Sequence, residues 1–101
     1  MSTTEAIIKA IRSVPQGKVA SYAQIAAEAG IPRGARQVAR ILHSCSKKHD
    51  LPWWRIVRSS GEIALPDSAG GSLQKERLLI EGVEFRSDRA VDMTVSCFLR
   101  H

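Results

Sequence analysis

Three apolar-periodic segments follow one another within the first 42 residues, and only short connections separate them. Apolar residues recur at helical spacing in the first segment until Pro15, which prevents a helix from continuing. Thr3 and Thr4 each carry a hydroxyl that can accept a hydrogen bond from a free backbone amide at a helix N-terminus. The pattern therefore predicts a helix over residues 4–14, with one of these threonines as its N-cap, in a mainly helical fold.

The second and third segments are joined by a short connection. Ser21 is followed three residues later by Gln24, the pattern of a capping box, which predicts a helix over residues 22–29. Gly30 ends that helix, and apolar residues resume at helical spacing over residues 35–42. Helix, short turn and helix are therefore expected in succession, as in a helix-turn-helix unit.

Positive charge is concentrated on and after the third predicted helix. Residues 31–58 carry seven lysine and arginine residues against the single acid Asp50, whereas the whole chain has a net charge of +5. Arg36 and Arg40 lie one helical turn apart, so they are expected on one face. Such a concentration is typical of proteins that neutralise DNA phosphates, although a solvated basic face on an ordinary helical hairpin is the alternative.

The middle of the chain predicts a small β-hairpin. Residues 44–50 are polar and are interpreted as a connection after the third helix. Two short apolar runs, 51–58 and 62–64, flank a Ser-Ser-Gly sequence at 59–61 that is suited to a turn. Residues 65–71 are rich in Pro, Asp, Ser and Gly and predict a loop.

A fourth helix is predicted over residues 72–81. Ser72 is the expected N-cap, and Gly82 is the expected C-terminal cap. Residues 83–101 alternate only weakly, so they are interpreted as irregular structure or a short final strand. The apolar residues that this fourth helix can contribute to a core are Leu73, Leu78, Leu79 and Ile80.

Length and composition predict one domain over residues 1–101. The first residues lack the pattern of a signal peptide, and no apolar stretch approaches the roughly 20 residues that span a bilayer. We therefore expect a cytoplasmic protein, associated with the nucleoid if its source is bacterial. Cys45 and Cys97 are too few for a disulfide framework. His43, Cys45 and His49 lack the spacing of a zinc site, so neither a metal nor a cofactor is expected.

Trp53 and Trp54 are the only tryptophans of the chain and follow directly after Pro52. Neighbouring residues of an extended segment point in opposite directions, so both rings are not expected to face the same core. One tryptophan can be a core residue, while the other meets solvent, a partner or a ligand. An aromatic ring beside a basic surface is suited to stacking on an unpaired base.

Several short motifs occur along the chain in a fixed order. They are Pro15-Gln16-Gly17-Lys18-Val19, Ser21-Tyr22, Ala35-Arg36, Pro52-x-x-Arg55-Ile56-Val57, Ser60-Gly61, Gly70-Gly71, Lys75-Glu76, Leu78-Leu79 and Glu81-Gly82. Together they resemble the C-terminal DNA-binding domain of the O6-alkylguanine-DNA alkyltransferases, the methylated-DNA–protein-cysteine methyltransferases. The resemblance covers residues 5–85. It implies a winged-helix-like helix-turn-helix domain of the alkyltransferase C-terminal type.

The most specific motif of that family is Pro-Cys-His-Arg, in which the cysteine accepts the alkyl group irreversibly. Here the motif reads Pro52-Trp53-Trp54-Arg55. A thiol with a pKa of about 8.5 needs help to ionise at neutral pH, and the family histidine supplies that help. The chain therefore resembles the non-reactive alkyltransferase-like branch, which commonly carries Trp for the cysteine. That branch usually keeps the histidine, so Trp54 is a departure.

The resemblance implies DNA-binding roles for residues of the helix-turn-helix. Tyr22 matches the tyrosine that presses on the target phosphate and helps to rotate the nucleotide outward. Arg36 matches the arginine that enters the base stack through the minor groove and fills the vacated place. The other expected DNA contacts on that helix are the small Ala35 and Ala39 and the larger Gln37 and Arg40.

The same resemblance implies a pocket for the flipped base. Its expected walls are the side chains of Leu42, Trp53, Trp54 and Arg55, with the backbone of the 64–70 loop around the base. Alkylation at O6 weakens pairing with cytosine and lowers the cost of flipping. A wide pocket lined by tryptophan is also expected to admit several alkyl sizes.

The expected function is binding of O6-alkylguanine in double-stranded DNA by a monomer, through minor-groove docking and nucleotide flipping, without alkyl transfer. The resemblance also implies that the bound lesion is flagged for nucleotide excision repair. One alternative is a sequence-specific helix-turn-helix regulator that reads base edges in the major groove. Another is residual alkyl transfer to Cys45 or Cys97.

Overall fold

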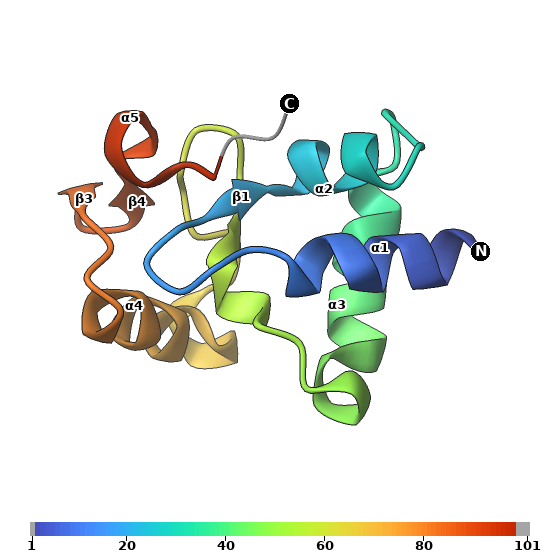
Figure 1. Cartoon of the computed structure of the whole chain (residues 1–101). Helices are drawn as coiled ribbons and strands as arrows, with labels where there is room; N and C mark the ends of the chain where they lie inside the picture. Colours follow the sequence, from blue (N-terminus) through green and yellow to red (C-terminus); the bar gives the residue numbers. More distant parts are fainter. Residues whose placement is uncertain (1, 99–101) are drawn as a thin grey trace.

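The computed structural model describes residues 2–98, whose buried side chains form two apolar clusters. The first cluster lies among α1 (Thr3–Arg12), α2 (Tyr22–Glu28) and α3 (Ala35–His49), which Figure 1 shows crossing one another. The second cluster packs under α4 and the C-terminal strands. The fully buried members include Ile7, Ile11, Ile25 and Val38 in the first cluster and Val19, Val57, Leu78 and Val91 in the second.

Both N-terminal helices begin at serine caps. The Ser2 hydroxyl accepts a hydrogen bond from the Glu5 amide at 3.1 Å, so α1 begins at Thr3 and neither predicted threonine is its cap. The capping box of α2 is confirmed. The Ser21 hydroxyl accepts from the Gln24 amide and the Gln24 side chain accepts from the Ser21 amide, both at 3.0 Å.

Helix α3 is longer than predicted. It continues to His49, so the interpretation of residues 44–50 as a connection was wrong. Lys47, Lys48 and His49 form its last turn, where cations are favourable beside free carbonyl groups. Asp50 ends the helix with a left-handed conformation at φ 51°. The polar sequence thus belongs to an exposed helix end.

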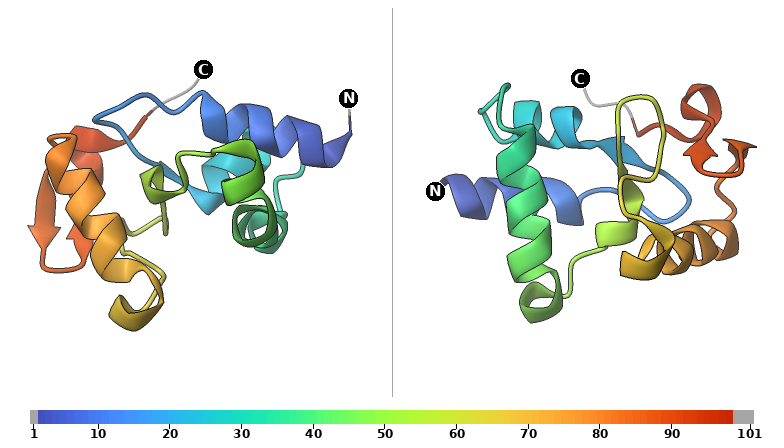
Figure 2. Two further views of the ribbon diagram at one scale, coloured as in Figure 1. Left: turned by 90° about the horizontal axis from the view of Figure 1, so that it is seen from below. Right: turned by 180° about the vertical axis from the view of Figure 1, so that it is seen from behind.

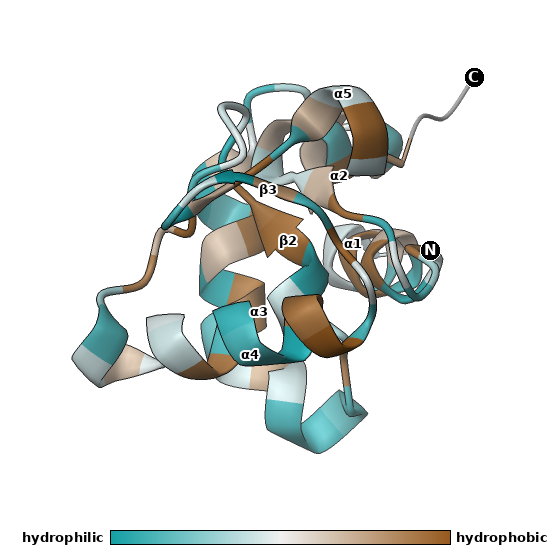
Figure 3. Ribbon diagram, turned by 90° about the vertical axis from the view of Figure 1, so that its left-hand side faces the viewer, coloured by the Kyte–Doolittle hydropathy of each residue, from teal (hydrophilic) through white to brown (hydrophobic). Residues whose placement is uncertain are grey.

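The hairpin predicted over residues 51–64 does not form. Instead β2 (Ile56–Val57) pairs in parallel with β1 (Ala20–Ser21), and residues Trp53–Arg55 form the short 3-10 helix η1. The tight turn is present, because the Arg58 amide donates to the Glu62 carbonyl at 3.0 Å. Both strands of the β1–β2 pair are buried. Residues 56–57 therefore pair with the distant strand β1 and not with the neighbouring run 62–64. Figure 3 shows hydrophobic β2 in front of α3.

Helix α4 spans Gly71–Ile80, close to the prediction, but its N-terminus is built differently. Gly70, at φ 109°, is the N-cap, and Ser72 makes no capping hydrogen bond. A Cβ on Gly71 would lie 2.4 Å from the Leu65 carbonyl oxygen, so only glycine allows the preceding loop to approach this closely. Gly82 follows the helix at φ 85°, as predicted for the C-terminal cap. The loop itself contains the short 3-10 helix η2 (Asp67–Ala69).

Only one of the four apolar residues expected in the core from α4 is fully buried there. Leu78 is 0% exposed, and it shares the inward face with Gln74, which is 2% exposed. Leu73, Leu79 and Ile80 are 43%, 53% and 77% exposed, so their prediction as core residues was wrong. The helix turns about 100° per residue, which carries positions directly after Leu78 away from the core.

The segment after residue 82 folds back onto the rest of the molecule. It forms the antiparallel strands β3 (Phe85–Ser87) and β4 (Ala90–Val91), followed by α5 (Met93–Ser96). Residues 83–98 were predicted to be irregular or a short final strand, so this antiparallel pair and the helix after it go beyond the prediction. Residues 99–101 of the predicted tail lie outside the described part. No helix within residues 2–98 combines the length and apolarity needed to cross a membrane.

Candidate nucleic-acid interface

A cavity of about 820 Å³ lies between α3 and the segment that leads into α4. Figure 2 shows α3 and α4 on either side of the chain around residues 50–57. The walls of the cavity come from the start of α2, one face of α3, η1, the loop after residue 63 and one face of α4. Elements that are distant in sequence thus form one site.

Helix α3 presents one face to the cavity. Ala35, Arg36, Ala39 and Leu42 line it, as expected for residues three or four apart on a helix. Arg36 lies in the first turn and is exposed. The structure brings these four predicted residues together. Gln37 and Arg40 are exposed on α3 but do not line the cavity.

Tyr22 lines the same cavity from the first turn of α2. The capping box at Ser21 fixes the backbone directly before it. Burial raises the pKa of the Tyr22 hydroxyl, and the charge of Arg58 opposes that rise by a smaller amount. The hydroxyl therefore remains protonated at neutral pH and can donate a hydrogen bond.

Trp53 and Trp54 both line the cavity, because η1 is a helical turn and not an extended segment. Their ring centroids are 6.0 Å apart with an interplanar angle of 89°. The assumption of an extended segment was therefore wrong, although Trp54 packs against the second apolar cluster and Trp53 belongs to neither, as expected of two rings that do not share one core. The Trp54 indole nitrogen donates to Glu81 Oε2 at 3.0 Å, which commits its only donor.

Arg55 does not line the cavity, contrary to its predicted place in the pocket wall. Its guanidinium donates to Glu81 through Nε at 3.0 Å and through Nη2 at 2.6 Å, and Nη1 donates to the Val14 carbonyl at 3.0 Å. The two charged groups are almost buried, with side chains 16% and 9% exposed. Arg55 therefore holds η1 in place from the side that faces away from the cavity.

The Glu81 carboxylate is the centre of this support. Burial opposes its ionisation, but hydrogen bonds from Arg55 and Trp54 and from the Gly17 amide outweigh burial and lower the pKa of Glu81. Gln74 adds a second tie, because its side-chain nitrogen donates to the carbonyl groups of Trp54 and Ile56 at 3.1 and 2.9 Å. The cavity wall is thus held to α4 by hydrogen bonds.

The loop after β2 closes another side of the cavity. Ala64, Leu65, Ala69 and Gly70 line it, within the 64–70 loop expected around the base. Arg89 holds this loop through its side chain, which donates to the Ile63 carbonyl at 3.3 Å and also to the Leu65 carbonyl and the Asp67 carboxylate. These hydrogen bonds therefore fix the backbone of the loop.

The cavity is strongly cationic. Four of its lining residues are Lys or Arg, and Asp50 is the one lining acid among the described residues. Sequence reasoning identified Arg36 but did not assign a site role to Lys47, Arg58 or Arg77. Lys47 was missed because α3 was predicted to end early. The spacing of four residues between Leu73 and Arg77 is the signal that could have placed both on one face of α4.

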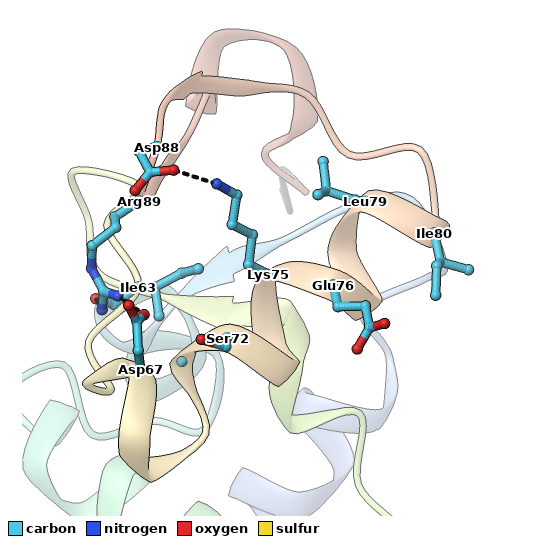
Figure 4. A pocket seen from close by; sticks show the side chains of 10 residues that line it. Ile63, Asp67, Ser72, Lys75, Glu76, Leu79, Ile80, Asp88 and Arg89 are labelled. Atoms are coloured by element: carbon cyan, nitrogen blue, oxygen red, sulfur yellow. Dashed lines mark hydrogen bonds and ion pairs between the residues drawn. The ribbon is translucent and has the colours of Figure 1, made fainter.

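A second hollow, of about 550 Å³, lies between α4 and the turn that joins β3 to β4. In Figure 4 the Lys75 side chain points toward Asp88, and these two groups pair at 2.7 Å. Arg89 and Asp67 form another ion pair in its wall. The charges of this hollow are thus partly neutralised within the chain.

Neither cysteine lines the cavity. Cys45 packs against the first apolar cluster from α3, and the Cys97 thiol is 3.3 Å from Gln24 Oε1. Within residues 2–98, no three His, Cys, Asp or Glu side chains gather as a metal site would require. The lining of the cavity offers aromatic stacking, apolar contact and cationic binding, and it also includes His43 and Ser46.

Comparison with known proteins identifies relatives in both sequence and fold. The family model for the DNA-binding domain of 6-O-methylguanine DNA methyltransferase matches residues 2–83. Alkyltransferase-like protein 1 of Schizosaccharomyces pombe is 40% identical over 79 residues, 77% of this chain and 73% of that protein. A DNA base-flipping protein of Vibrio parahaemolyticus is 40% identical over 80 residues, 77% of each. The crystal structure of S. pombe Atl1 with damaged DNA containing O6-carboxymethylguanine superposes with a TM-score of 0.87 at 31% identity, covering 97% of this chain and 95% of that one.

Proposed function

Because the chain belongs to the family of DNA-binding domains of 6-O-methylguanine DNA methyltransferases, we propose that it captures O6-alkylguanine in duplex DNA without alkyl transfer. The observation that carries this proposal is the meeting of Tyr22, Arg36 and Trp53 in one cavity. These residues come from three different elements. Their convergence supports a site in which a nucleotide is rotated out, replaced in the stack and held.

Each of the three residues has a physical task in the proposed capture. The protonated Tyr22 hydroxyl can donate to the phosphate of the rotated nucleotide. Arg36, exposed at the start of α3, can enter the minor groove and fill the vacated place in the stack, next to the small Ala35 and Ala39. Extrusion costs a few kcal/mol, less for a weakened pair, and stacking on Trp53 offsets that cost.

The absence of transfer is supported by the residue at position 53. An indole ring is not a nucleophile that accepts an alkyl group in this way, and position 54 offers no imidazole base. Cys45 and Cys97 lie away from the cavity lining, which argues against a displaced acceptor. We therefore propose that the chain is not an enzyme.

Binding without repair requires a later step by other proteins. The family resemblance supports nucleotide excision repair as that step, with this chain acting as a monomeric marker of the lesion. Since its proposed target is genomic DNA, we propose that it works in the cytoplasm, at the nucleoid of a bacterial source. The Atl1 structure holds an O6-carboxymethyl adduct, which supports adducts larger than methyl as targets.

A fluorescence-anisotropy titration tests lesion capture. We expect tighter binding to duplexes with O6-methylguanine or bulkier O6 adducts than to unmodified duplex. We expect Tyr22→Ala and Arg36→Ala to weaken lesion binding about tenfold or more, equal to about 1.4 kcal/mol, because each removes a group that serves flipping. Arg40→Ala is the matched control, since Arg40 carries the same charge on α3 but lies outside the cavity. It should weaken all duplexes alike.

The sequence-specific regulator makes a different prediction for the same titration. Its affinity would follow the base sequence and ignore the adduct, because major-groove readout depends on base edges. Equal binding of damaged and undamaged duplexes in every sequence context would therefore contradict lesion capture. Unchanged lesion affinity in both the Tyr22 and the Arg36 variants would contradict the flipping mechanism.

A further inference from the structure

We propose that Arg77 makes the cavity selective for O6 substituents that end in a carboxylate; this inference rests on the proposed lesion capture. Arg77 lies on α4 and lines the cavity beside Trp54. Its guanidinium carbon is 4.7 Å from the centroid of the Trp54 ring, within the range of a cation–π contact. The contact holds a positive charge against the same wall that Trp54 and Leu73 form.

The charge of Arg77 is available to a ligand. The ion pairs among residues 2–98 join Arg55 to Glu81, Lys75 to Asp88 and Arg89 to Asp67, and none of them includes Arg77. Lys75, two residues earlier on α4, points toward Asp88 in Figure 4 and does not line the cavity. A guanidinium without an anionic partner is free to bind one, and its planar fork matches a carboxylate.

The neighbouring donors in this wall are already used. The indole nitrogen of Trp54 donates to Glu81, and the side-chain nitrogen of Gln74 donates to two backbone carbonyl groups. Leu73 offers only apolar contact. A polar group at the end of an O6 substituent that reaches this wall therefore finds Arg77 as its charged donor, whereas a neutral substituent gains less.

A DNA phosphate presents the same anionic oxygen chemistry as a carboxylate adduct. Arg36 and Lys47 supply cations from α3, the proposed DNA-facing helix, and Arg58 supplies one after β2. Arg77 is the lining cation that α4 carries among the described residues, and it is held against Trp54 in the pocket wall. Arg77 is exposed on α4, so its contact with Trp54, whose ring lines the cavity, is the observation from which we propose the adduct as its target.

The test compares four duplexes that differ only at one base: guanine, O6-methylguanine, O6-carboxymethylguanine and O6-carbamoylmethylguanine. The last two have nearly the same shape and differ in charge. We expect the wild-type chain to bind the carboxymethyl duplex about tenfold more tightly than the carbamoylmethyl duplex. Arg77→Gln should remove this ratio and leave carbamoylmethyl affinity within about twofold, because glutamine keeps helix propensity but not charge.

Lys75→Gln is the control, since it removes the same charge from α4 outside the cavity and should keep the wild-type ratio. A thermal melt of each variant confirms folding. Equal affinity of the wild type for both large adducts, with both tighter than guanine, would overturn this inference while lesion capture stands. An equal loss by Arg77→Gln on all four duplexes would identify a phosphate contact and also overturn it. If no adduct binds more tightly than guanine, the proposed function fails as well.

Discussion

Trp53 and Trp54 are adjacent in the sequence but make different contacts. Among the described residues, no hydrogen-bond partner is found for the Trp53 indole, which leaves this ring available to the cavity. Trp54 donates to Glu81, and the guanidinium carbons of Arg55 and Arg77 lie over its ring at 5.3 and 4.7 Å from the centroid. Trp54 thus acts as a structural link between the wall and α4.

The contacts of Trp54 predict what a restored cysteine can do. Trp53→Cys should give no efficient alkyl transfer, because position 54 provides no base and Glu81 is bound by the indole. The double variant Trp53→Cys with Trp54→His should gain transfer, since an imidazole can favour the thiolate. Intact-mass measurement after incubation with O6-methylguanine duplex detects the added methylene. Transfer by the single variant as fast as by the double variant would contradict this role of Trp54.

The local sequence predicted one helix cap correctly and another wrongly. The capping box at Ser21 was read correctly because both partners lie within four residues. Ser72 has the same residue type before an apolar run, yet the approach of Gly71 to the Leu65 carbonyl places Gly70 at the cap instead. That approach is a tertiary contact, so the cap at Gly70 cannot be predicted from the local sequence pattern.

The same substitution is therefore expected to destabilise the chain at Ser21 and to have little effect at Ser72. Ser21→Ala should lower the free energy of unfolding by about 1 kcal/mol, because it removes the hydroxyl that caps α2. Ser72→Ala should change it by less than about 0.5 kcal/mol, since exposed positions without special contacts tolerate substitution. Urea denaturation of both variants measures the difference. Equal destabilisation by the two substitutions would show that the caps are wrongly assigned.

The strand pairing marks another limit of local sequence. Residues 51–58 were predicted as one strand of a hairpin with residues 62–64, but only Ile56–Val57 form a strand, and its partner is β1, which lies more than thirty residues earlier. Parallel pairing across two helices cannot be read from alternation within a short run. The final β3–β4 hairpin was missed because its alternation is weak and its burial depends on contacts with residues 61–63.

Over the whole molecule, Glu81 ties distant segments together. Its carboxylate accepts from Gly17 before β1, from Trp54 and Arg55 in η1, and it lies directly after α4. Burial opposes ionisation of this carboxyl, and the hydrogen bonds still bring its pKa below the ordinary 4.5. A lowered folded-state pKa contributes stability above the unfolded pKa, and that contribution is lost as pH falls through the folded value.

Glu81→Gln should therefore destabilise the chain at neutral pH by about 1–3 kcal/mol, since charged hydrogen bonds are removed. The difference from wild type should persist down to pH 4.5 and shrink at lower pH, where wild-type Glu81 itself becomes protonated. Asp88→Asn is the control, because Asp88 also forms an ion pair, with Lys75, but is exposed, and the substitution should have no measurable effect. Denaturation curves across pH give both values, and a pH-independent difference would refute the assignment.

Much of the site could be predicted from sequence, because the resemblance fixed Tyr22, Arg36 and Trp53 by their motifs. The structure adds residues that have no motif, such as Arg77 and Gln74, which reach the cavity only through the packing of α4. The structure also shows that Arg55 does not line the cavity as predicted. Its side chain turns toward Glu81, with which it forms an almost buried ion pair.

Lesion capture without chemistry is tested most directly by tryptophan fluorescence and protein mass in one titration. Both tryptophans line the cavity, so a flipped base that stacks there should quench their emission. We predict quenching by duplex containing O6-methylguanine, much weaker quenching by unmodified duplex, and an unchanged intact mass after incubation. Equal quenching by the two duplexes, or a mass increase of one methylene, would contradict the account.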